Sequence, residues 1–128
     1  MFEGFINKCK QHEIPFVYNS PWQKQLSTEE VRMNVVHSLL PLDLRPSNHI
    51  ANGYIACRAI KNISYGALGM TNSKQTYDLF DGEIAYAPNS GDLFDVAIEM
   101  SITIVESLFE NAKLSIETEE LWDSLEKV

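Results

Sequence analysis

The sequence has few basic residues, and it has no long apolar run. Ten Lys and Arg stand against 18 Asp and Glu among 128 residues, and the resulting net charge of -8 disfavours binding to nucleic acid or an anionic membrane. No window approaches the roughly 18 apolar residues of a membrane span, and the first residues lack the basic and apolar regions of a secretory signal. We therefore expect a cytoplasmic protein that contacts neither nucleic acid nor membrane directly.

Metal, cofactor and catalytic motifs are also missing. The two cysteines, Cys9 and Cys57, form no C-x-x-C pair and have apolar residues nearby in the sequence, so we expect two reduced, buried thiols. The three histidines do not occur at the i, i+4 spacing of a helical metal pair. Gly66 and Gly69 lack the Lys-Ser/Thr that completes a phosphate loop, and no calcium-loop pattern is present. These absences predict no metal, no cofactor and no catalytic residue.

The length fits one domain over residues 1–128, because typical domains have roughly 100 to 150 residues. The hydrophobic fraction of 45% and the charged fraction of 22% are ordinary for a globular chain. The best-delimited element is a helix over 28–40, which Ser27 and Glu30 begin as a capping box and Pro41 ends. Two further elements precede it, a short amphipathic helix over 2–13 and an irregular aromatic loop over 15–26.

Residues 48–70 fit two templates, and the choice between them sets the fold class. The Asn-Gly pair at 52–53 is a turn signal, and the segments 54–60 and 63–69 after it are compatible with the two strands of a hairpin. If the glycine is instead tolerated within a helix, 48–61 forms a buried helix and the fold is all-α. Because Asn and Gly are poor in a helix interior, the sequence favours a helix-rich α+β fold with a small antiparallel sheet, with all-α as the alternative.

Beyond residue 70 the pattern predicts a helical turn over 73–80 and a strand over 82–88. A cap at 89–91 then precedes a helix over 92–111, and Ser115 or Thr118 is expected to cap a last helix. Both helices present an apolar face, which we expect to be buried. Its residues are Phe94, Ile98, Ile102, Ile104, Val105, Leu108 and Phe109 in the first helix and Leu121, Trp122, Leu125 and Val128 in the last.

The charge is distributed unevenly along the chain. Residues 1–91 hold eight acids and eight bases, whereas 92–128 hold ten acids and two bases, so that the whole net charge of -8 lies in the last segment. At about 100° per residue, five acids of the 92–111 helix fall within a stripe about 60° wide. They are Asp92, Asp95, Glu99, Glu106 and Glu110, and we expect Glu119, Glu120 and Asp123 of the last helix to extend the stripe.

An anionic stripe without neighbouring bases suits a cationic protein partner. Like charges at helical spacing repel by about 0.2–0.5 kcal/mol per pair, and Lys or Arg supplied by a partner relieves that repulsion and speeds association. In size, charge and missing catalytic motifs, the chain is similar in kind to bacterial immunity and antitoxin proteins. We therefore predict a non-enzymatic binding protein that inhibits or neutralises a basic partner, for example a nuclease toxin whose substrate groove is cationic.

A small enzyme is the first alternative, since polar residues concentrate in the proline-bounded loop from Asp43 to His49. A catalytic role for Asp43, Arg45, Ser47 and His49 requires a pocket that they line together. We favour the simpler interpretation, in which the loop makes hydrogen bonds to its own backbone. His37 lies within the predicted 28–40 helix, and we expect it to be a partly buried structural residue.

A homo-oligomer is the second alternative, in which the aromatic loop or the 92–111 helix is buried against a copy of the chain. The loop carries Phe16, Tyr18 and Trp22, residue types that dominate binding energy when they lie exposed at an interface. These three side chains therefore form a possible secondary binding surface. We nevertheless favour a structural role for them, as a cover for the core over the first two helices.

Overall fold

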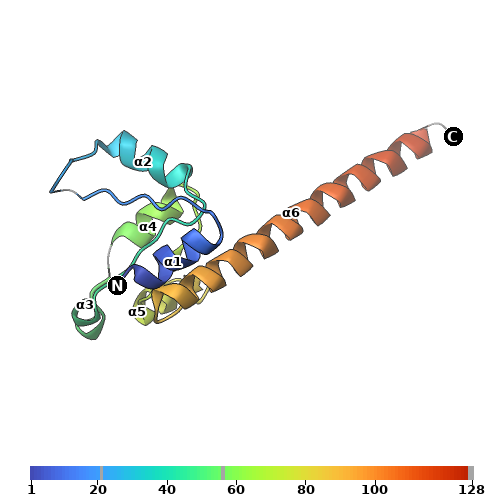
Figure 1. The fold of residues 1–128 in the computed structure, drawn as a ribbon. Coiled ribbons are helices and arrows are strands. Elements are labelled where there is room, and N and C mark those ends of the chain that lie inside the picture. The colour runs from blue at the N-terminus through green and yellow to red at the C-terminus, as the bar shows by residue number, and fades with distance from the viewer. Residues whose placement is uncertain (21, 56, 127–128) are drawn as a thin grey trace. The chain divides into compact units, whose positions relative to one another are not determined.

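The computed structural model describes residues 1–20, 22–55 and 57–126 (Figure 1). The chain divides into two compact units, Met1–Ile98 and Glu99–Val128, which we call unit 1 and unit 2. Every buried side chain among the described residues lies in unit 1, where the hydrophobic core is built. The single domain expected over residues 1–128 stays a prediction.

Helices dominate the described residues. The elements, in chain order, are α1 (Glu3–Gln11), α2 (Thr28–Val36), α3 (Ser47–Ala51), α4 (Cys57–Ser64), β1 (Met70–Thr71), α5 (Lys74–Leu79), β2 (Ala85–Tyr86) and α6 (Ser90–Glu126). The predictions of a helix over 2–13, a helical turn over 73–80 and a strand within 82–88 are confirmed by α1, α5 and β2. The helix-rich character predicted from the sequence is therefore confirmed.

The small sheet is parallel, not antiparallel as predicted. Met70 of β1 lies opposite Ala85 of β2, and Thr71 lies opposite Tyr86. Asp43 adds an isolated parallel bridge to Thr71 on the other side of β1. The reason is the connection between the strands, because α5 lies between them and carries the chain back to the starting edge before β2 begins.

The hairpin predicted over 54–60 and 63–69 is wrong, because α4 passes through its expected turn. The turn signal at 52–53 is nevertheless correct, since Gly53 has a φ of 70° and follows the end of α3. A single helix over 48–61 is therefore excluded as well. Ala59 and Asn62 are the buried residues of α4, and their spacing of three places both on one helical face.

The capping box at the start of α2 is confirmed. Ser27 Oγ accepts a hydrogen bond from the Glu30 backbone N–H at 3.1 Å, and Glu30 Oε2 accepts one from the Ser27 N–H at 2.7 Å. The helix ends at Val36, short of the predicted residue 40, and no described residue of α2 is buried. His37 is exposed, with Nδ1 2.8 Å from the Met33 carbonyl oxygen, so its predicted partial burial is wrong.

One part of the core of unit 1 forms where α1 packs against the first turns of α6 (Figure 1). The rings of Phe5 and Phe94 meet edge to face, with their centroids 5.4 Å apart. The Phe5 backbone N–H donates to Ser90 Oγ at 3.3 Å. A Cβ on Gly4 would lie 2.9 Å from the backbone nitrogen of Gly91, so this close approach of the two helices requires glycine.

The two cysteines are free and differ in exposure. Cys9 is buried on α1, whereas Cys57 is exposed at the start of α4. The predicted burial is therefore confirmed for Cys9 and wrong for Cys57. Cys9 is four residues after Phe5 and lies on the face that α1 turns toward the core, whereas Cys57 is followed by Arg58 and is exposed on α4.

An alkylating reagent is expected to modify Cys57 much faster than Cys9 in the folded protein. Burial raises the pKa of the Cys9 thiol and shields its sulfur, and both effects reduce the accessible thiolate. We expect the rates to differ by at least about tenfold at mildly alkaline pH. Peptide mass spectrometry after timed exposure to iodoacetamide measures the two rates, and in concentrated urea they should converge. Equal rates in the native protein would contradict the burial of Cys9.

Candidate functional site

Acidic side chains are the dominant feature of α6 in unit 2. Residues 99–126 contain eight acids and a single base, Lys113, and all eight acids are exposed. At about 100° per residue, three of the predicted site residues fall within about 40° of one another. Glu117, which was not predicted as a site residue, joins them. We call this set the acidic row, and it consists of Glu99, Glu106, Glu110 and Glu117.

The last three predicted site residues do not extend the acidic row. Glu119 and Asp123 lie about 160° and 120° around the helix from its centre, and Glu120 lies about 60° from it. All three are exposed. These three acids are therefore exposed on α6, but they lie on other sides of the helix from the acidic row.

The physical reason is that α6 runs without interruption from Ser90 to Glu126. Ser115 Oγ donates to the Asn111 carbonyl oxygen at 3.1 Å, and Thr118 Oγ1 donates to the Leu114 carbonyl oxygen at 2.8 Å. Hydroxyls that bond four residues back belong to a helix interior, not to a helix start. The predicted separate last helix is therefore wrong. A continuous helical count through residue 117 would have found Glu117 from the sequence.

The other two predicted stripe residues, Asp92 and Asp95, belong to unit 1 and have local contacts there. The Asp92 backbone N–H donates to Asn89 Oδ1 at 2.8 Å, and Asn89 Nδ2 donates to Asp92 Oδ2 at 2.5 Å. Asp95 Oδ2 accepts from Lys8 Nζ of α1 at 3.0 Å. The cap predicted at 89–91 is thus confirmed, and these two carboxylates serve the start of α6 and its packing.

Exposed apolar side chains accompany the acidic row on α6. The predicted burial of the apolar face holds for Phe94 in unit 1, which is 1% exposed, but fails further along the helix. The exposed fractions are 53% for Ile102, 48% for Ile104, 59% for Val105, 62% for Leu108 and 77% for Phe109, with 62% for Leu121, 63% for Trp122 and 58% for Leu125. Val128 lies outside the described residues. Unit 2 is therefore a helix with exposed carboxylates and exposed aliphatic and aromatic groups.

The three aromatic side chains of the loop over 15–26 differ in burial. Phe16 is half-buried, and its ring centroid lies 6.3 Å from that of Phe2 and 6.1 Å from that of Phe5. Tyr18 lies 5.7 Å from Phe2 but is 64% exposed, and Trp22 is 95% exposed. The structural role predicted for these rings is therefore confirmed for Phe16 and wrong for Trp22.

A groove of about 440 Å³ lies between the aromatic loop and α2. Lys24 Nζ lies 3.9 Å from Glu30 Oε1 within it. The lining residues are Val17, Asn19, Lys24, Leu26, Glu29, Glu30, Met33 and Asn34. This groove includes none of the polar residues from Asp43 to His49.

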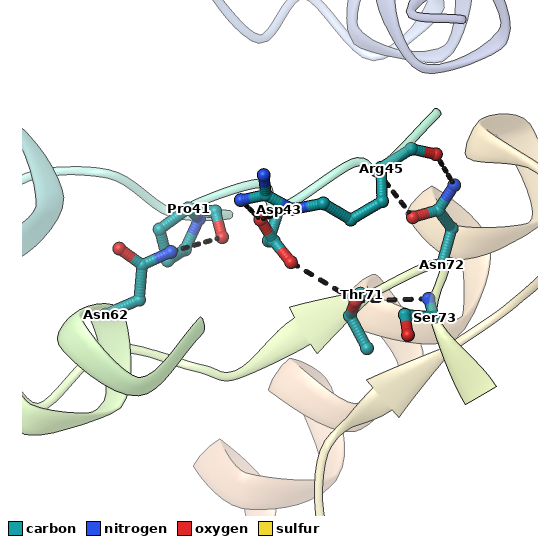
Figure 2. A network of polar contacts seen from close by, with 7 residues as sticks. All are labelled: Pro41, Asp43, Arg45, Asn62, Thr71, Asn72 and Ser73. Carbon is teal, nitrogen blue, oxygen red and sulfur yellow. Dashed lines mark hydrogen bonds and ion pairs between the residues drawn. The ribbon is translucent and has the colours of Figure 1, made fainter. Parts of the chain in front are cut away.

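Asp43 instead belongs to a polar network in the core of unit 1 (Figure 2). Its side chain is 1% exposed, and Oδ1 accepts from Arg45 Nη2 at 2.6 Å and from Arg45 Nε at 3.0 Å. The Thr71 hydroxyl donates to Asp43 Oδ2 at 3.3 Å. Both carboxylate oxygens therefore bond to groups of unit 1 beside the parallel bridge.

Backbone contacts complete this network (Figure 2). Asn72 clamps the main chain of Arg45, because its Oδ1 accepts from the Arg45 N–H at 2.8 Å and its Nδ2 donates to the Arg45 carbonyl at 2.9 Å. Asn62 Nδ2 of α4 donates to the Pro41 carbonyl at 3.1 Å. These contacts fix the loop on β1 and α4, which favours a structural role over a catalytic one.

The other polar residues of the loop differ from Asp43 in their burial and contacts. Ser47 is exposed at the start of α3, and His49 is half-buried with its ring 5.1 Å from that of Tyr54. The Arg45 guanidinium carbon lies 5.8 Å from the Tyr54 ring centroid, so the cation interacts with both this ring and Asp43. The enzyme alternative requires Asp43, Arg45, Ser47 and His49 to line one pocket, but these four residues differ in exposure and in contacts.

The described residues hold no group of three or more His, Cys, Asp or Glu that is placed to bind a metal ion. No helix in this part of the chain is long and apolar enough to cross a membrane. Comparison of the chain with protein-family models, with curated proteins and with solved structures gives no match.

Proposed function

We propose that the protein is a non-enzymatic binding protein that engages a basic protein partner through α6 of unit 2. The observation that carries this proposal is the charge of residues 99–126, which hold eight exposed acids against one base. Inhibition or neutralisation of a nuclease toxin is one such function, since a groove that binds nucleic-acid phosphates must be cationic.

The spacing of the acidic row supports a partner with several cations. Glu106 and Glu110 are one turn apart, about 6 Å along the axis, and the full row from Glu99 to Glu117 extends over about 27 Å. At physiological salt a charge is screened over about 8 Å, so neighbouring carboxylates of the row act together on an approaching cation. Such a surface accelerates association and sets the register of the complex.

The exposed apolar groups beside the row supply a second kind of contact. Charged pairs at an interface rim contribute mainly to association rate, whereas desolvated apolar and aromatic groups contribute most of the affinity. Leu114 and Leu121 are exposed at about 60° and 40° around the helix from the centre of the acidic row, so α6 suits a partner with an apolar strip bordered by Lys or Arg.

Reversing the charge at Glu110 and Glu117 together is expected to weaken capture of the basic partner. The double variant Glu110→Lys/Glu117→Lys changes the net charge from -8 to -4 (-8 + 4) and removes half of the acidic row. The purified partner should associate at least about tenfold more slowly at low salt. Affinity capture from lysate at low and high salt, followed by mass spectrometry, finds the partner, and stopped-flow mixing measures the rate.

The matched control is Glu13→Lys/Glu83→Lys, which makes the same change in net charge with exposed acids of unit 1. It should leave the capture and the association rate close to those of the wild type. Equal slowing by both double variants would assign the effect to net charge and contradict a binding role for the acidic row. A captured partner that is acidic, or one retained equally at high salt, would also contradict the proposal.

A further inference from the structure

The exposed apolar residues of unit 2 follow a coiled-coil spacing over part of α6. Ile102, Val105, Phe109, Ala112 and Ile116 recur at alternating steps of three and four residues. At about 100° per residue they occupy an arc about 80° wide, centred about 100° from the acidic row. All five are exposed, and Phe109 is 77% exposed. We call these five residues the seam.

We infer that a second copy of this chain packs antiparallel along the seam. An apolar strip at this spacing is the surface that one helix presents to another in a two-stranded coiled coil. Two features of the sequence on α6, the sizes of the seam residues and the charges beside them, favour a copy in the antiparallel orientation. This inference does not rest on the proposed function, because it depends on the seam, and Glu106 at the edge of the seam is the one residue of the acidic row that it uses.

The first feature is the alternation of large and small side chains. In an antiparallel pair centred between residues 110 and 111, Phe109 faces Ala112 of the copy, and Val105 faces Ile116. A large ring is then opposite a small methyl, which fills the space between the helices evenly. A parallel pair would instead place Phe109 against Phe109 and Ala112 against Ala112, which leaves a crowded layer next to an empty one.

The second feature is the charge along one edge of the seam. Glu106 and Lys113 both flank this edge, about 20° apart around the helix, and Lys113 is the single base of residues 99–126. The antiparallel pair brings Glu106 of one copy beside Lys113 of the other, and the twofold symmetry makes this pair twice. A parallel pair brings Lys113 beside the apolar Leu108 instead, and the complementary charges do not meet.

The seam has a defined end. Beyond Ile116, Glu119 and Asp123 occupy the positions at which the apolar spacing would continue, so Ile102 faces Glu119 of the copy at each end of the antiparallel pair and the apolar layers lie between residues 105 and 116. A dimer of this size is reversible and depends on protein concentration. Glu110 and Glu117 point away from the seam and stay exposed in the dimer, so self-association and binding of a basic partner are compatible.

Sedimentation velocity of the full chain across a wide concentration range tests the inference. A reducing buffer is needed, since Cys57 is exposed and could cross-link copies. We expect a monomer–dimer equilibrium whose dissociation constant rises at least about tenfold in Val105→Glu. The matched control is Leu114→Glu, because Leu114 is 57% exposed but lies about 160° from the seam centre. Circular dichroism checks that both variants keep their helix content.

A charge-swap cycle tests the orientation without an added charge in the seam. Glu106→Lys and Lys113→Glu are each expected to weaken the dimer by about fivefold, because each creates two like-charge pairs across the interface. The double variant Glu106→Lys/Lys113→Glu should restore the wild-type dissociation constant to within about twofold. The two residues are seven positions apart and do not contact each other within one helix, so the restoration reports on contacts between copies.

Three outcomes would overturn the inference. They are a monomer at all concentrations, a Leu114→Glu variant as disruptive as Val105→Glu, and a double swap that fails to restore the dimer. The proposed function can fail independently, because Glu110→Lys/Glu117→Lys should weaken partner capture while leaving the dimer intact.

Discussion

Replacing Asp43 with alanine is expected to lower the free energy of unfolding of unit 1 by about 3–5 kcal/mol. The substitution leaves the guanidinium of Arg45, whose side chain is 18% exposed, without its carboxylate partner. It also removes the acceptor of the Thr71 hydroxyl beside the parallel bridge. Urea unfolding followed by far-ultraviolet circular dichroism measures the loss.

The matched control for this variant is Asp78→Ala on α5. Asp78 also pairs with a cation, Lys74, but both side chains are more than half exposed, so solvent screens the pair. We expect that substitution to cost no more than about 0.5 kcal/mol. Asp43→Asn keeps an oxygen for Thr71 but loses the charge, and should fall between the two. If Asp43→Ala destabilised the protein no more than Asp78→Ala, the network would not be a structural element of the core.

Replacing Leu93 with alanine is expected to cost about 2–5 kcal/mol of unfolding free energy. Leu93 is on the first turn of α6 and is 0% exposed, so the shorter side chain leaves a cavity in the core of unit 1. Leucine and alanine both have high helix propensity, and the substitution therefore affects packing more than helix formation. The same urea titration measures the change.

Leu114→Ala on the same helix is the control, because Leu114 is 57% exposed and lies outside the seam. It should change the unfolding free energy by less than about 0.5 kcal/mol. Similar costs for the two leucines would mean that the core extends along α6 into unit 2. The described burial instead ends at Ala97, and the comparison of Leu93 with Leu114 checks where it ends.

Several local features of this protein could be predicted from a few neighbouring residues. The capping box of Ser27 and Glu30, the cap at Asn89 and the turn at 52–53 each depend on contacts within about one helical turn. The same is true of the shared face of Glu99, Glu106 and Glu110, since helical geometry fixes it once the helix exists. These elements were predicted correctly because their causes lie within the segment itself.

The candidate site was predicted less completely, for two physical reasons. Ser115 and Thr118 are good caps by residue type, yet both bond back into a continuous α6, and this moved Glu119 and Asp123 away from the acidic row. Asp95 lies only about 40° around the helix from the centre of the row, but it belongs to unit 1 and pairs there with Lys8 of α1. Neither contact has a signature in the local pattern.

The sequence by itself determined the acidic charge of the last segment, its helical periodicity and the caps and turns that begin or end several helices. Only the tertiary structure decided the parallel direction of β1 and β2 and the burial of Asp43. It also decided that Phe94 is buried while Phe109 of the same helix is exposed. The reason is that a cap or a helical face is set within one turn of the chain. The burial of a residue and the direction of a strand depend on which distant segment of the chain packs against it, as α1 packs against Phe94.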